Sequence, residues 1–144
     1  MPIWFDGFPL EIVRERSQNT LVGHLGIEFL EAGDDYVRAR MPVDDRTRQP
    51  AGMLHGGASV VLAETLASWA ASFTVDPQKN HCVGLEINAN HVRALASGWV
   101  IGTARPAHLG RSTQIWEVRM VDESNRLICI SRVTMAVLST PSRY

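Results

Sequence analysis

One acidic residue in the middle of the chain lies where a carboxylate could do chemistry. Glu64 is the only formally charged side chain between Gly56 and Val75. Its apolar neighbours go almost all the way round a helix, which is typical of a helix enclosed by other structure. Enclosure drives a carboxylate toward its neutral form unless polar groups support its charge. The pattern predicts a catalytic base or nucleophile, and the competing interpretation is a Glu that caps the helix or forms an ion pair on an exposed helix face.

A His-Gly-Gly turn comes directly before this helix, at His55, Gly56 and Gly57. Glycine lets a backbone approach a ligand closely, and N–H groups at a helix start point outward with a favourable dipole. These properties suit a site for a carbonyl oxygen that gains charge. An ordinary glycine turn before a helix is the alternative, and His55 fits a structural cap as well as it fits a site residue.

The spacing of these groups indicates how they could meet. Gly56 and Glu64 are eight residues apart, about 12 Å along a continuous helix. A Glu side chain leans toward the helix N-terminus without closing that gap. We therefore expect an active site shared between two subunits whose helices lie antiparallel. Ser68, four residues after Glu64, falls on the same face and is a candidate to hold the carboxylate or a water, whereas Thr65 should point elsewhere.

Length and composition narrow the class of protein. The chain has 144 residues, which predicts one domain over residues 1–144 with one core. The net charge is −1, so the protein has no excess of positive charge that would attract nucleic acid or an anionic membrane. The N-terminus has no signal-peptide pattern, and Ser, Thr, Gly and Glu64 interrupt the central apolar run. We expect a cytoplasmic protein with neither nucleic acid nor membrane as a partner.

The two cysteines give no sign of a metal site or a disulfide. Cys82 and Cys129 each lie in an apolar run that resembles a strand. They lack the close pairing and the partner histidines of a metal site. The prediction is two reduced core thiols and no bound metal.

The surrounding elements must position these residues. Hydrophobic periodicity and turn residues predict a short helix over 9–16, strands over 26–30 and 36–43, and the central helix from 56 to about 75. Four more strands are expected over 82–92, 98–105, 112–122 and 127–138. Short connections favour an antiparallel sheet, so the fold class is α+β with one long helix on a sheet. Because a single sheet face cannot cover a helix that is apolar all round, either the sheet curls around it or a second subunit covers the rest.

Three segments resemble the hotdog-fold acyl-CoA thioesterases. They read MPVDDRTRQPAGMLHGGASVVLAE from Met41, VGLEINANHVR from Val83 and HLG from His108. The resemblance extends over about residues 20 to 138 and is greatest to the bacterial branch that hydrolyses aromatic acyl-CoA esters, including 1,4-dihydroxy-2-naphthoyl-CoA. It implies an antiparallel sheet wrapped around one long helix, homodimers that assemble into homotetramers, and no cofactor, since CoA is part of the substrate.

The resemblance also implies roles for individual residues. It places the Gly56 N–H at the thioester oxygen, with Glu64 as base or nucleophile. Gln49 would orient the water or the acyl group, and His55 would support the carbonyl. Gly84 would let the pantetheine arm pass close to the backbone.

The acyl and CoA ends of the substrate have further candidates. Relatives carry smaller residues at the position of Trp69, whose indole could shorten the acyl pocket or stack on an aromatic acyl group. Arginine suits phosphate oxygens through its paired donors, so the CoA phosphates could meet His91, Arg93, Arg111 or Ser112. A solvated strand edge explains each of these four equally well.

Two other functions compete with an acyl-CoA thioesterase. A hydratase or dehydratase of the same fold usually pairs a His with an acid in a different motif, which this sequence lacks. A non-catalytic acyl-CoA binding module would have no use for Glu64. The leading prediction is hydrolysis of aromatic or medium acyl-CoA thioesters.

Overall fold

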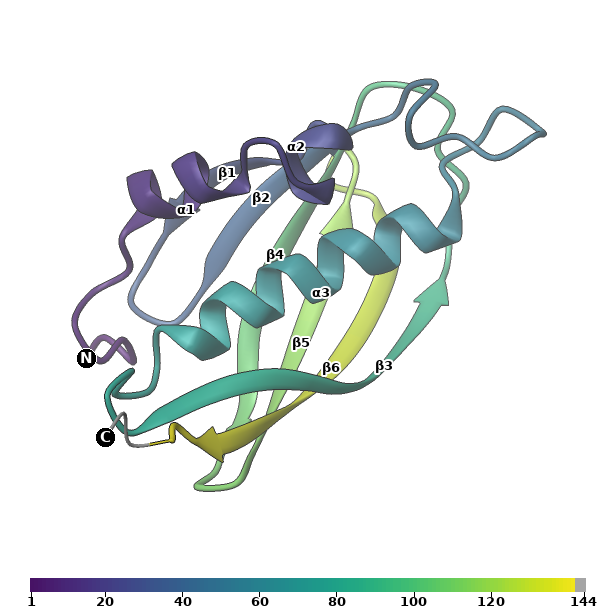
Figure 1. The fold of residues 1–144 in the computed structure, drawn as a ribbon. Coiled ribbons are helices and arrows are strands. Elements are labelled where there is room, and N and C mark those ends of the chain that lie inside the picture. Colours follow the sequence, from purple (N-terminus) through teal and green to yellow (C-terminus); the bar gives the residue numbers. More distant parts are fainter. Residues whose placement is uncertain (142–144) are drawn as a thin grey trace.

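The computed structural model describes residues 1–141, which form three helices and six strands (Figure 1). In chain order they are α1 (Leu10–Ser17), α2 (Leu21–His24), β1 (Glu28–Ala32), β2 (Val37–Pro42), α3 (Gly56–Ser72), β3 (Asn80–His91), β4 (Trp99–Leu109), β5 (Thr113–Val121) and β6 (Leu127–Ser139). The order of two strands, one long helix and four strands is confirmed. The short helix α2 was not predicted.

All six strands form one antiparallel sheet in the order β1-β2-β4-β5-β6-β3. The sheet curves around α3, with β3 below the helix and α1 and α2 above it in the view of Figure 1. Alternation of Val37, Ala39 and Met41 with Arg38 and Arg40 puts the apolar side chains inward, because successive strand residues face opposite sides. The expected α+β sheet wrapped around a central helix is confirmed.

The sheet covers only one face of α3. Its eight buried residues recur three or four positions apart: Ala58, Ser59, Leu62, Ala63, Leu66, Ala67, Ala70 and Ala71. On the remaining surface Glu64 is exposed, and Val61, Ser68 and Trp69 are half-buried. The prediction of a helix and a carboxylate enclosed on all sides is therefore wrong for the single chain, since apolar composition alone does not say which residues find a partner.

The last strand of the sheet, β3, has a free edge. Among residues 1–141 it pairs with β6 alone, and its register shifts between Gly84 and Glu86. Val83 is 40% exposed and Leu85 is 62% exposed. A long, unpaired edge that carries apolar side chains is a ready template for pairing with another chain.

None of the helices found in residues 1–141 combines the length and the hydropathy needed to cross a membrane.

Candidate active site

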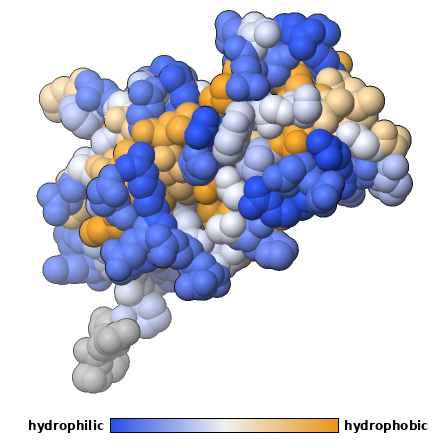
Figure 2. Space-filling model, turned by 90° about the horizontal axis from the view of Figure 1, so that it is seen from above, coloured by the Kyte–Doolittle hydropathy of each residue, from blue (hydrophilic) through white to orange (hydrophobic). Residues whose placement is uncertain are grey.

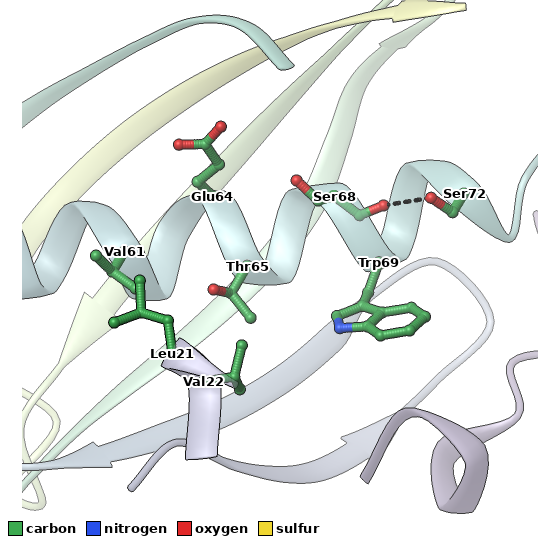
Figure 3. Close-up of a pocket in the computed structure, with 8 residues that line it drawn as sticks. All are labelled: Leu21, Val22, Val61, Glu64, Thr65, Ser68, Trp69 and Ser72. Carbon is green, nitrogen blue, oxygen red and sulfur yellow. Dashed lines mark hydrogen bonds between the residues drawn. The ribbon is translucent and has the colours of Figure 1, made fainter. Parts of the chain in front are cut away.

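A groove runs along the uncovered side of α3 (Figure 3). Its volume is about 450 Å³. We call it the Glu64 groove; its lining residues come from α2 and α3 and are Leu21, Val22, Val61, Glu64, Thr65, Ser68, Trp69 and Ser72. One carboxylate and three hydroxyls thus share a hollow with aliphatic and aromatic side chains. Apolar side chains are also visible in a hollow of the face seen in Figure 2.

Glu64 lies beside the bulged part of β3. A Cβ atom added at Gly84 would lie 2.7 Å from Glu64 Oε1, closer than real Cβ contacts allow. Glycine at this position therefore leaves room for the carboxylate over the strand backbone. Gly84 was expected to make room for a pantetheine arm, and the structure shows that it makes room for the acid.

The hydroxyl residues of the groove differ in their directions. Ser68 follows Glu64 by one turn and lines the groove with it, but its side chain has no hydrogen bond to the carboxylate within the described residues. Its carbonyl accepts from Ser72 Oγ at 2.8 Å (Figure 3). Thr65 leaves α3 on another side than Glu64, as expected, and still lines the groove.

Trp69 provides the aromatic wall of the groove. Its ring stacks on Phe73, with centroids 5.8 Å apart and planes 6° from parallel. The indole and the Glu64 carboxylate leave α3 in different directions, so the acid and the aromatic surface are separate features of one groove (Figure 3). Trp69 was expected near the acyl pocket, and the structure places it in the wall of the Glu64 groove.

A second hollow, the helix-start pocket, lies at the N-terminus of α3. Its volume is about 380 Å³. Four predicted site residues, Gln49, Gly56, His91 and Arg93, lie in it. The full lining is Gln49, Met53, Leu54, Gly56, Ser59, His91, Val92, Arg93, Ala94 and Ile128.

His55 is the N-cap of α3. Its Nδ1 accepts a hydrogen bond from the Gly57 N–H at 2.8 Å, which satisfies one of the free N–H groups of the first turn. A neutral imidazole that accepts at Nδ1 carries its proton on Nε2. The cap therefore orients a ring donor at the mouth of the helix, so the two interpretations of His55, cap and site residue, are compatible.

Gly56 and His91 are in close contact. A Cβ added at Gly56 would lie 2.9 Å from His91 Nε2. As the first residue of α3, Gly56 has no acceptor for its N–H inside the helix. The contact places the imidazole of His91, the second one at the helix start after that of His55, beside the free N–H of Gly56. Gln49 lies at the same pocket, where its side-chain oxygen accepts from the Ala51 N–H.

Arg111 and Ser112 lie far from this pocket, in the turn between β4 and β5. The Ser112 carbonyl accepts from Val137 N at 2.9 Å. Val137 pairs with Cys82, whose Sγ donates to the Ala71 carbonyl near the end of α3. This turn is thus on the side of the molecule where the helix ends, separated from it by β6 and β3.

The four phosphate candidates therefore form two groups. His91 and Arg93 lie at the start of α3, and Arg111 and Ser112 lie toward the side where it ends. A helix of 17 residues is about 25 Å long at 1.5 Å per residue. A single chain does not bring the four residues together.

No group of three or more His, Cys, Asp or Glu side chains within residues 1–141 is arranged to hold a metal ion. Both cysteines are free thiols. Burial raises the pKa of the Cys82 and Cys129 thiols, which keeps them protonated and poorly nucleophilic.

Several wall residues were not expected from the sequence. Leu21 and Val22 line the Glu64 groove because the four-residue helix α2 passes beside α3. Such a short helix has no hydrophobic period that a sequence could show. Ser59 is 1% exposed and lines the helix-start pocket. Ser59 follows Gly56 by three residues on the same helix face, and this spacing could have identified it from the sequence as a residue of the same pocket.

Known proteins share both the sequence and the structure. The sequence profile described as the thioesterase superfamily matches residues 51–129. The chain is 48% identical to the 1,4-dihydroxy-2-naphthoyl-CoA hydrolase of Escherichia coli (strain K12), over 94% of this chain and 99% of that protein. It is 50% identical to the proofreading thioesterase EntH of Cronobacter turicensis, over 94% and 98% of the two chains.

A solved structure agrees with these matches. The crystal structure of a mutant thioesterase from Pseudomonas aeruginosa superposes with a TM-score of 0.94 at 46% identity, covering 96% of this chain and 99% of that one. The six-stranded antiparallel sheet around one long helix is thus the hotdog arrangement of this enzyme's relatives. The chain belongs to the thioesterase superfamily and is a thioester hydrolase.

Proposed function

We propose that this enzyme hydrolyses acyl-CoA thioesters with aromatic or medium acyl groups to the free acid and CoA. The observation that carries the proposal is a lone carboxylate, Glu64, in a groove with an aromatic wall, Trp69. The relative from Escherichia coli is named for a substrate that combines an aromatic acyl group with CoA, which supports the same substrate class here.

Glu64 acts on the thioester carbonyl in this proposal. As a general base it removes a proton from water, whose oxygen attacks the carbonyl carbon while the C–S bond breaks. The departing thiolate of CoA then takes up the proton. As a nucleophile the carboxylate attacks the same carbon and displaces the CoA thiolate, and water then hydrolyses the resulting anhydride to the free acid and the Glu64 carboxylate, with a proton going to the thiolate. In both routes the carbonyl oxygen gains charge and needs donors.

The donors come from the helix-start pocket and from the N-cap residue next to it, His55. The Gly56 N–H points out of the helix start with the dipole behind it, and His55 can donate from Nε2 because its Nδ1 accepts from Gly57. Gln49 and His91 line the pocket beside them. Together they fit a thioester oxygen and its attacking water.

We propose that the active site combines the Glu64 groove of one subunit with the helix-start pocket of its partner. The axial separation of about 12 Å between Gly56 and Glu64 favours this arrangement over one within a chain. The free edge of β3, with Val83 and Leu85 exposed, gives two chains a place to pair next to Gly84 and Glu64. Dimers would then assemble into tetramers.

Release of free thiol from benzoyl-CoA tests the activity. Wild-type enzyme should release CoA and Glu64→Ala should not. A panel of aryl, short, medium and long acyl-CoAs then ranks the substrates. Tight binding of benzoyl-CoA without thiol release would favour a binding module, and no hydrolysis across the panel would refute the proposal.

Mixed dimers test the shared site. We expect Glu64→Ala and Gly56→Val chains to be inactive separately, because the valine side chain would collide with His91. The two variants are unfolded, combined in equal amounts and refolded, so that half of the dimers contain one chain of each kind. Each mixed dimer has one intact active site of two, so about a quarter of the wild-type activity should return. Mixed dimers without activity would rule out sharing.

A further inference from the structure

The N-terminal residues 3–8 run past the C-terminal end of α3, and we call them the N-terminal strap (Figure 1). The Trp4 indole N–H donates to the Gly33 carbonyl at 2.7 Å. The Phe5 N–H donates to the Phe73 carbonyl at 2.8 Å. The strap is therefore attached both to the turn after β1 and to the residue that caps α3.

A series of aromatic rings connects the core to the Glu64 groove through this strap. Buried Trp116 stacks with Trp4 at 6.5 Å. Trp4 meets Phe8 edge to face at 5.1 Å, and Phe8 meets Phe73 edge to face at 5.1 Å. The series ends where Phe73 stacks on Trp69, which lines the groove.

Phe8 is the member of the strap that reaches the groove wall. Its ring packs against Phe73, which is stacked on Trp69, so Phe8 supports the indole through Phe73. Offset stacks and edge-to-face contacts hold rings in defined orientations. The indole is thus supported from behind at the end of the groove nearest the C-terminus of α3.

We propose that Phe8 is a positioning residue that sets the acyl-group specificity of the Glu64 groove. By holding Phe73 and Trp69 in place, it keeps that end of the groove closed and presents a rigid flat surface. A flat, short aryl group can lie on such a surface, whereas a long flexible chain would have to push the indole aside. This inference rests on the proposed acyl-CoA hydrolysis and adds the length and shape of the acyl group.

The test is the ratio of kcat/KM for dodecanoyl-CoA to that for benzoyl-CoA. We expect Phe8→Ala to raise this ratio about tenfold, a change in the range that pocket size produces. Phe8→Tyr, which keeps the ring, should leave the ratio within about twofold of the wild-type value. If Phe8→Ala does not fold, Phe8→Leu should raise the ratio in the same direction by a smaller factor.

Phe5→Ala is the matched control. It lies in the same strap, its side chain is 57% exposed, and the substitution keeps the backbone N–H that donates to Phe73. Its ratio should equal that of wild type. A Phe8→Ala enzyme with a lower melting temperature and an unchanged ratio would overturn the proposal, as would an equal shift in Phe5→Ala.

A second measurement separates this inference from the proposed function. If the wild type hydrolyses neither ester, the proposed function fails, and the Kd values for benzoyl-CoA and dodecanoyl-CoA are compared instead. Phe8→Ala should then change their ratio about tenfold in favour of the longer chain. An unchanged Kd ratio would overturn the specificity role.

Discussion

The two hollows along α3 contrast in the chemistry that they offer. The Glu64 groove has one carboxylate among aliphatic and aromatic walls. The helix-start pocket has donors, since it combines the free N–H of Gly56 with His91, Gln49 and Arg93. A hydrolase needs both an acid–base group and donors for the developing charge. Neither hollow is complete by itself.

The contrast arises from how the start and the middle of one helix are held. The start of α3 is fixed by the His55 cap and by the contact of Gly56 with His91. Glu64, in the middle, faces the edge strand β3 at Gly84 and remains exposed. One helix thus offers a rigid donor site and an open acid site, which suits pairing between subunits.

Removal of the acid should have the largest effect. We expect Glu64→Gln to lower kcat for benzoyl-CoA by about 10³-fold or more, because the amide can neither accept the proton nor attack. The melting temperature should stay close to that of wild type, since an exposed side chain contributes little to stability. A variant that keeps a tenth of the activity would show that the groove does not hold the catalytic group.

Crowding of the donor site should have the next largest effect. In Gly56→Ala the new Cβ falls 2.9 Å from His91 Nε2, so the imidazole or the helix start must shift. A shift of this kind costs about 10²-fold in kcat.

The double variant Gly56→Ala/His91→Ala checks the cause. Without the His91 ring the added methyl has room, so the alanine should cost much less than in the wild-type background. Equal costs in the two backgrounds would mean that the contact with His91 is not the reason.

Displacement of the carboxylate should have a smaller effect. Gly84→Ala puts a methyl 2.7 Å from Glu64 Oε1, and a flexible side-chain end can move aside. We expect kcat to fall about tenfold with KM little changed. The melting temperature should not fall, because alanine restricts the unfolded chain more than glycine does. A loss of stability would identify a packing defect instead.

Removal of the His55 N-cap of α3 should have the smallest effect. His55→Ala should lower the free energy of unfolding by about 1 kcal/mol, because the Gly57 N–H loses its acceptor. His55→Asn should restore stability, since asparagine is a good N-cap. It should not restore kcat if the Nε2 donor matters. Urea unfolding and steady-state rates of both variants separate capping from catalysis, and full activity in His55→Asn would remove His55 from the donor set.

Much of the fold and part of the site could be predicted from residue patterns. Alternation in β2 and the long apolar run of α3 specify strand and helix locally, because side-chain direction repeats with periods of two and 3.6. Glu64 and the His-Gly-Gly turn at His55 were recognisable because polar or backbone-permissive residues interrupt apolar sequence. The helix α2 was missed because one turn has no period.

The sequence by itself determined the order of the elements, the family resemblance and the distance along α3 between Gly56 and Glu64. Only the tertiary structure decided that Glu64 is exposed beside Gly84, that His91 sits on Gly56, and that Arg93 and Arg111 lie toward opposite ends of the helix. The physical reason is that local spacing is set by the backbone, whereas contact between distant residues depends on strand register and sheet curvature, which many residues determine together.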